Sequence, residues 1–119
     1  MGKKILFVDD LADWRSMVAT ALSEAGFEVL TAKDASDAMT QMEGAELGLV
    51  ILDLDLAGES GRMLLKFVKH NLPGVPVLLF TSLEHDDATI LAMMKEGADQ
   101  YLNKGPMEQL ILTVGSYFK

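Results

Sequence analysis

The feature that most constrains the fold of this chain is an alternation, repeated five times, between a short apolar run and a longer segment of helical periodicity. The run at residues 49–52 is apolar throughout, which is typical of a strand covered on both faces. In the segment after the first run, apolar residues recur at helical spacing, as at Trp14, Val18 and Leu22. We therefore predict one parallel sheet with helices on both faces, joined by right-handed crossovers. The predicted strands are residues 4–8, 27–31, 49–52, 75–80 and 100–102.

Local signals mark the ends of the predicted helices. Asp34 is expected to cap the second helix and Asp13 the first, because a carboxylate can accept a hydrogen bond from a free N–H of the first turn. Gly26 ends the first helical pattern, and Pro106 opens the last. The expected fold is a doubly wound α/β domain with a five-stranded parallel sheet in the flavodoxin-like order 2-1-3-4-5. We expect residues 1–119 to form this one domain, without an output domain.

The charge balance bears on possible partners. Eighteen acidic residues against ten basic ones give a formal net charge of −8. Contacts to phosphates depend on clustered lysine and arginine, so this balance argues against direct binding to nucleic acid or an anionic membrane. The chain has no cysteine, which excludes disulfides and thiolate sites and fits a reducing compartment such as the cytoplasm. No apolar run reaches the length of a membrane span.

Polar residues gather where the predicted strands end. Asp9 and Asp10 follow the first strand, Asp53 follows the third, Thr81 the fourth and Lys104 the fifth. The carboxyl ends of parallel strands form the edge at which open α/β sheets bind ligands, and the first and third strands flank the crevice in this strand order. Three carboxylates crowded there need a cation. Oxygen ligands favour a hard divalent ion, and Mg²⁺ fits best because it also accepts a phosphoryl oxygen.

This set of groups suits phosphoryl transfer. Lys104 would add a positive charge and Thr81 a hydroxyl donor, and with the metal ion they would stabilise charge at a phosphorus atom under in-line attack. The nucleophile would be a carboxylate, which would form an aspartyl phosphate.

In order and spacing, these residues resemble the receiver domain of two-component response regulators over essentially the whole chain. Receiver domains carry an acidic pair after the first strand, an acceptor aspartate after the third, a threonine or serine after the fourth, a Gly-Ala-Asp before an aromatic residue of the fifth, and then a lysine. The matching residues are Val8-Asp9-Asp10, Leu52-Asp53-Leu54, Thr81, Gly97-Ala98-Asp99, Tyr101 and Lys104.

The resemblance implies specific roles. Asp53 would accept a phosphoryl group from a histidine kinase or a phosphotransfer protein, without acting as a turnover enzyme on a small substrate. Asp9, Asp10, Asp53 and the backbone carbonyl of Asp55 would hold Mg²⁺. The phosphoryl group would contact Thr81 and Lys104, and the switch pair would be Thr81 and Tyr101.

The resemblance also predicts an output surface on the fourth helix, the fifth strand and the last helix, for a downstream protein or a second copy of the chain. The helix expected near residues 86–96 has apolar residues on more than one side. A helix lying on a sheet needs only one apolar stripe, so we predict an exposed apolar patch around Ile90 and Met94.

The sequence lacks two prolines of the family pattern. Ala57 stands where a proline usually follows the acceptor, and Gly105 stands where a proline usually follows the lysine. A cis bond before a residue other than proline costs roughly 2.5–4 kcal/mol, so we predict a trans Lys104–Gly105 bond.

Two other functions remain open from the residues. The chain could be a degenerate receiver that acts as an interaction module without phosphorylation. A Mg²⁺-dependent phosphatase of the haloacid dehalogenase type would also use an Asp-x-Asp motif, and Asp53-Leu54-Asp55 has that spacing. That motif normally follows the first strand, however, and the chain has no room for the cap domain of such enzymes.

Overall fold

The computed structural model describes residues 4–54, 61–81 and 87–118. Within them, five parallel strands form one sheet in the order β2-β1-β3-β4-β5, which confirms the predicted topology. The elements in chain order are β1 (Lys4–Val8), α1 (Ala12–Glu24), β2 (Glu28–Ala32), α2 (Ala35–Met42), β3 (Leu47–Leu52), α3 (Gly61–Asn71), β4 (Val77–Thr81), α4 (Asp87–Lys95), β5 (Gln100–Asn103), α5 (Met107–Gly115) and the 3₁₀ turn η1 (Ser116–Phe118).

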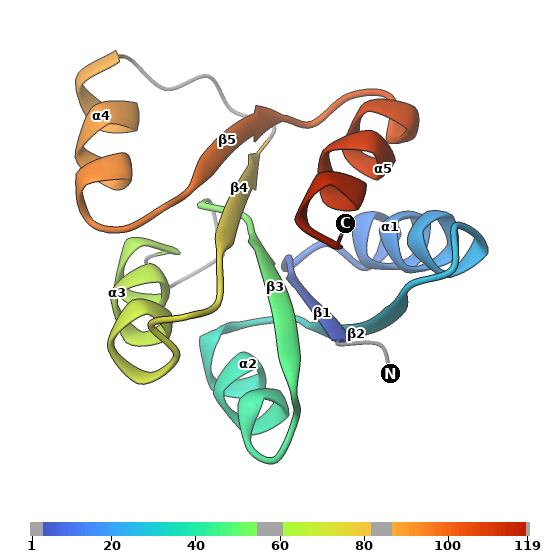
Figure 1. The fold of residues 1–119 in the computed structure, drawn as a ribbon, viewed down its shortest axis with the longest axis horizontal. Coiled ribbons are helices and arrows are strands. Elements are labelled where there is room, and N and C mark those ends of the chain that lie inside the picture. The colour runs from blue at the N-terminus through green and yellow to red at the C-terminus, as the bar shows by residue number, and fades with distance from the viewer. Residues whose placement is uncertain (1–3, 55–60, 82–86, 119) are drawn as a thin grey trace.

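Helices cover both faces of the sheet (Figure 1), with α1 and α5 on one face and α2, α3 and α4 on the other. Neighbouring residues of a strand point to opposite faces, so each central strand contributes to two apolar layers. In β1, Ile5 and Phe7 join the layer under α1 and α5, whereas Leu6 and Val8 join the other. This division explains why the central strands are apolar at nearly every position.

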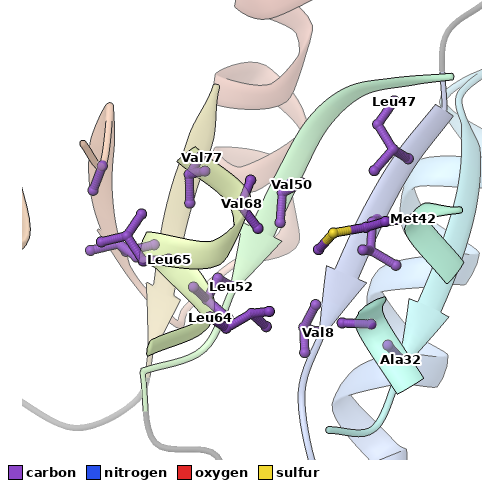
Figure 2. Packing of buried hydrophobic residues seen from close by; sticks show 14 of the residues in the cluster. Val8, Ala32, Met42, Leu47, Val50, Leu52, Leu64, Leu65, Val68 and Val77 are labelled. Atoms are coloured by element: carbon purple, nitrogen blue, oxygen red, sulfur yellow. The ribbon is translucent and has the colours of Figure 1, made fainter. Parts of the chain in front are cut away.

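Figure 2 shows the layer under α2 and α3. Leu64 and Val68 of α3 pack in one cluster with Val50 of β3 and Val77 of β4, and Met42 brings α2 into the same cluster. All but Met42 are completely buried. Burying one side chain of this size contributes about 1.5–3 kcal/mol, so these contacts fix α3 on the sheet.

The predicted element ends agree with the structure less closely than the topology does. Asp34 caps α2, because its Oδ1 accepts a hydrogen bond from Asp37 N at 2.8 Å. The predicted Asp13 cap is wrong: Leu11 is the N-cap of α1, without a side-chain cap. The Leu11 N–H is instead satisfied by Asp9 Oδ1 at 2.9 Å. Gly26 and Gly97, which follow α1 and α4, have φ angles of +100° and +118°, and this left-handed region favours glycine.

Among the described residues, no helix combines the length and the apolar character that crossing a membrane would require.

Candidate functional site

The site lies at the carboxyl edge of the sheet, where three strands end side by side. Asp9 and Asp53 immediately follow β1 and β3, and their backbones extend the parallel ladder. Asp9 N donates to Ala32 O at 3.0 Å, and Asp53 N donates to Val8 O at 3.1 Å. These hydrogen bonds fix the backbone positions from which both aspartate side chains extend.

Asp9, Asp10 and Asp53 form a cluster in which one carboxylate oxygen of each lies within 4.8 Å of the others. The side chains differ in exposure: Asp9 is 0% and Asp53 3% exposed, whereas Asp10 is partly exposed. The structure therefore brings together the three carboxylates that the sequence placed after two different strands.

Lys104 enters this cluster from the end of β5. Its Nζ donates to Asp53 Oδ2 at 3.1 Å and lies 2.5 Å from Asp9 Oδ2. The lysine side chain is 1% exposed, and its backbone N donates to Thr81 O at 2.9 Å. The Lys104–Gly105 peptide is trans, as predicted. One ammonium group thus pairs with two of the three carboxylates of the cluster.

Asp9 shows the electrostatic consequence. Burial raises the pKa of Asp9 above its usual value, and the charge of Asp53 raises it further. Hydrogen bonding to Lys104 and to Leu11 N lowers the pKa and offsets part of this effect. Asp9 Oδ2 is completely buried and, apart from its ion pair with Lys104, has no hydrogen-bond partner among the described residues.

This donor set fits a hard divalent cation. All three side chains offer carboxylate oxygens, the ligands that Mg²⁺ prefers. A cation would also contact the buried carboxylate of Asp9 and offset the negative charges of the three aspartates. Asp55, whose carbonyl is the fourth predicted ligand, lies outside the described residues.

The predicted switch residues occupy adjacent strands. Thr81 is the last residue of β4, is fully buried, and pairs with Asn103 of β5. Tyr101 is half-buried, and its hydroxyl donates to Asn103 Oδ1 at 2.8 Å. Thr81 therefore lies at the same edge as the acidic cluster, while the Tyr101 hydroxyl bonds within its own strand.

The predicted output residues lie on α4. Ile90 and Met94 are both half-buried, and Met94 packs against the core cluster under α2 and α3. The large apolar side chain that this helix exposes is Leu91, at 57%. The role of Ile90 and Met94 in an output surface stays a prediction.

Three residues near the cluster were missed or misread by sequence reasoning. Trp14, predicted only as one of the apolar residues at helical spacing, places its ring centroid 4.7 Å from Lys104 Nζ. Arg15, which the sequence analysis did not single out, donates from Nη1 to Asp9 O at 2.9 Å. Gly61 begins α3 so close to the chain after β3 that a Cβ there would lie 2.8 Å from Asp53 O. An arginine six residues after an acidic strand end is the one signal that was available.

Known proteins that are similar to this chain belong to one family. The family model described as the response regulator receiver domain matches residues 5–114. The phosphate regulon transcriptional regulatory protein PhoB of Pseudomonas aeruginosa is 35% identical over 106 residues, which cover 87% of this chain and 46% of PhoB. The nitrogen assimilation regulatory protein NtrX of Azorhizobium caulinodans is 33% identical and is covered to 23%. The chain thus spans less than half of these curated relatives.

A solved structure matches over the full length. The chemotaxis protein CheY4 of Vibrio cholerae superposes with a TM-score of 0.91 at 28% identity, covering 98% of this chain and 99% of that one.

The charge balance argued against direct binding to nucleic acid. These comparisons do not support that prediction, because relatives such as PhoB are named as transcriptional regulators.

Proposed function

The chain belongs to the response regulator receiver domain family, and we propose that it acts as a phosphoacceptor, with Asp53 as the residue that takes the phosphoryl group. The donor would be a phosphohistidine of a histidine kinase or a phosphotransfer protein. The proposal includes the cytoplasmic location expected of a receiver domain.

One observation carries this proposal: the Lys104 amine, the Asp53 carboxylate and the two further acids meet at one edge of the sheet. Lys104 Nζ is 3.1 Å from Asp53 Oδ2, and Asp9 and Asp10 place carboxylate oxygens within 4.8 Å of that of Asp53. An isolated surface aspartate would need none of these neighbours. The combination supports a nucleophile with a bound cation and a separate positive charge for a transferred group.

In the proposed step, a carboxylate oxygen of Asp53 attacks the phosphorus in line with the bond to the histidine nitrogen. The new O–P bond forms as the P–N bond breaks, and the leaving imidazole keeps the electron pair and takes up a proton from water. The Lys104 ammonium balances negative charge on a phosphoryl oxygen. Bound Mg²⁺, held by Asp9, Asp10 and Asp53, would supply further neutralisation of that charge.

The proposed output couples Thr81 and Tyr101 to the surface of α4, β5 and α5. Thr81 would contact the phosphoryl group, and Tyr101, held by Asn103 in this structure, would change position with it. Leu91 on α4 and Leu112 on α5 are exposed apolar side chains on the same elements. A downstream protein or a second copy would dock there, and any contact with nucleic acid would belong to a longer protein that carries this domain.

Intact mass measurement tests the proposal. The protein incubated with acetyl phosphate should gain one phosphoryl group when Mg²⁺ is present and none when the metal is chelated. A chromogenic phosphate ester should give no sustained release of phosphate, because the carboxylate is labelled stoichiometrically. Turnover of the ester would instead support the phosphatase alternative. Absence of labelling in the presence of Mg²⁺ would support the degenerate receiver.

A further inference from the structure

We propose that Trp14 is a positioning residue that holds the Lys104 ammonium at Asp53 through a cation–π contact. The inference rests on the proposed function, because it assigns Trp14 a part in the same reaction. Lys104 Nζ lies 4.7 Å from the centroid of the Trp14 ring. This distance is within the range at which an ammonium is attracted to the ring face.

The ring is itself packed against Phe80, which a further aromatic side chain supports. Trp14 meets Phe80 of β4 edge to face, with centroids 5.8 Å apart and planes at 86°. Phe80 in turn contacts Phe7 of β1 at 6.3 Å, and both phenylalanines are completely buried. Edge-to-face pairs of this kind have preferred geometry. The indole therefore presents a fixed face to Lys104 instead of a mobile side chain.

Lys104 needs such support in this chain. It is followed by Gly105, and a Cβ at Gly105 would meet only Asn103 O, at 3.9 Å. A side chain at this position would therefore have space. The Lys104 backbone N–H is held by Thr81 O, but the next residue is glycine, which has the widest conformational freedom of any residue. A lysine stem also loses considerable rotamer freedom when its amine is fixed. The Trp14 ring limits the movement of the Lys104 amine by contacting the lysine side chain, and this restraint does not depend on the backbone.

The contact of Lys104 with the Trp14 ring differs from the ion pairs of Lys104 in the source of the attraction. Lys104 forms ion pairs with the carboxylates of Asp9 and Asp53. Any ligand that binds these carboxylates would compete with Lys104 for them. The attraction of the ring quadrupole does not depend on those charges. Trp14 therefore keeps the ammonium near Asp53 whatever the carboxylates bind, and contributes to keeping water from an amine whose side chain is 1% exposed.

The test compares the rates at which variants of the 119-residue chain are labelled by acetyl phosphate at saturating Mg²⁺. Trp14→Leu should label about five- to tenfold more slowly, and Trp14→Phe, which keeps a ring, should recover most of the rate. Phe27→Leu, which removes an aromatic pair with Phe118 elsewhere, should label at the wild-type rate. If Trp14→Phe is as slow as Trp14→Leu, or if neither is slowed, the proposal is overturned.

A double-mutant cycle separates positioning from general packing. Once Lys104→Met has removed the ammonium, Trp14→Leu should cause no further slowing. The same slowing in both backgrounds would mean that the ring acts independently of the lysine.

A second readout needs no phosphorylation. Trp14 is the only tryptophan of the chain, so its fluorescence reports the contact directly. Lys104→Met should change the emission of the metal-free protein, whereas Lys69→Met, which removes an ion pair with Asp99, should not. Unchanged emission in Lys104→Met would overturn the contact. If wild type is not labelled at all, the proposed function and the positioning role both fail, and the emission still decides whether the contact exists.

Discussion

At the scale of single residues, Asp9 carries the electrostatic strain of the site. It is fully buried, faces Asp53, and has one ammonium to share with it. Burial first, and Asp53 in addition, raise the pKa of Asp9, which means that its charged form is disfavoured in the folded protein. A cation that binds the folded cluster removes this penalty and should stabilise the fold.

Mg²⁺ should therefore raise the melting temperature. A ligand that binds only the native state at a hundredfold excess over its Kd stabilises by about 2.7 kcal/mol. Asp10→Asn should reduce this gain, because it removes one ligand of the cluster. Asp34→Asn is the matched control, since asparagine caps a helix as well as aspartate does, and it should keep the gain. Differential scanning fluorimetry with a Mg²⁺ titration measures both; a melting curve that Mg²⁺ leaves unmoved would contradict the metal site.

Gly61 is the second residue whose identity matters for the site. A Cβ at this position would lie 2.7 Å from Leu54 Cα and 2.8 Å from Asp53 O, so Gly61→Ala must push α3 away from the chain that follows Asp53. We expect a loss of about 1–3 kcal/mol in the free energy of unfolding and slower labelling of Asp53. Urea denaturation and intact mass measure the two effects.

Gly115→Ala provides the comparison for Gly61→Ala. Gly115 is at the end of α5, and a Cβ there meets nothing within 4 Å. Alanine at that site should leave labelling unchanged and cost no stability, because it favours helix over glycine. Equal behaviour of the two variants would show that the close approach at Gly61 has no role.

At the scale of elements, side-chain contacts tie the helices to each other and to the sheet. Arg62 at the start of α3 donates from Nε to both carboxylate oxygens of Glu96, at 2.9 and 2.8 Å, just after α4. This pairing lowers the pKa of Glu96. Tyr117 of η1 donates to Gln100 Oε1 of β5 at 2.7 Å. The chain end is therefore fastened to the strand that carries Tyr101 and leads into Lys104.

Tyr117→Phe should destabilise the protein by about 0.5–1.5 kcal/mol near pH 8, because it removes this hydrogen bond. Burial, and then the charge of Asp99, raise the pKa of Tyr117 above its usual value near 10. A raised pKa means that folding favours the neutral phenol, so the stability it contributes is present below about pH 10 and is lost as pH rises through the folded-state pKa. Urea midpoints at increasing pH should therefore show the difference from wild type shrinking; a difference that grows would contradict this account.

The elements also show what sequence patterns can and cannot predict. The three central strands β1, β3 and β4 were predictable, because strands buried on both faces are apolar at nearly every position. The edge strands β2 and β5 are less buried and carry polar residues, so they were predictable mainly from their place in the alternation with helices. The residues at which the strands begin and end were less predictable. β3 begins at Leu47, two residues before the predicted start, because Leu47 pairs with Lys4 and Gly48 can sit within a strand despite its low β-propensity. Asp13 was misassigned because Asp9, two residues before the N-cap, already binds the Leu11 N–H.

At the scale of the whole molecule, the strand order brings the residues of the site together. β1 and β3 are neighbours although α1, β2 and α2 separate them in the chain, and this brings Asp9 and Asp10 beside Asp53. The meeting of these acids with Lys104 was predictable from topology, because strand ends share an edge. The contact of Trp14 with Lys104 and the fit of Gly61 were not, because both depend on how a helix packs against residues distant in sequence.

The central claim is that Asp53 receives the phosphoryl group, and site-specific loss of labelling tests it most directly. Wild type, Asp53→Asn and the control Asp34→Asn are incubated with acetyl phosphate and Mg²⁺, and the intact mass of each is measured. Wild type and Asp34→Asn should each gain one phosphoryl group, while Asp53→Asn should gain none. A phosphoryl group that still appears on Asp53→Asn would contradict the assignment of Asp53 as the acceptor.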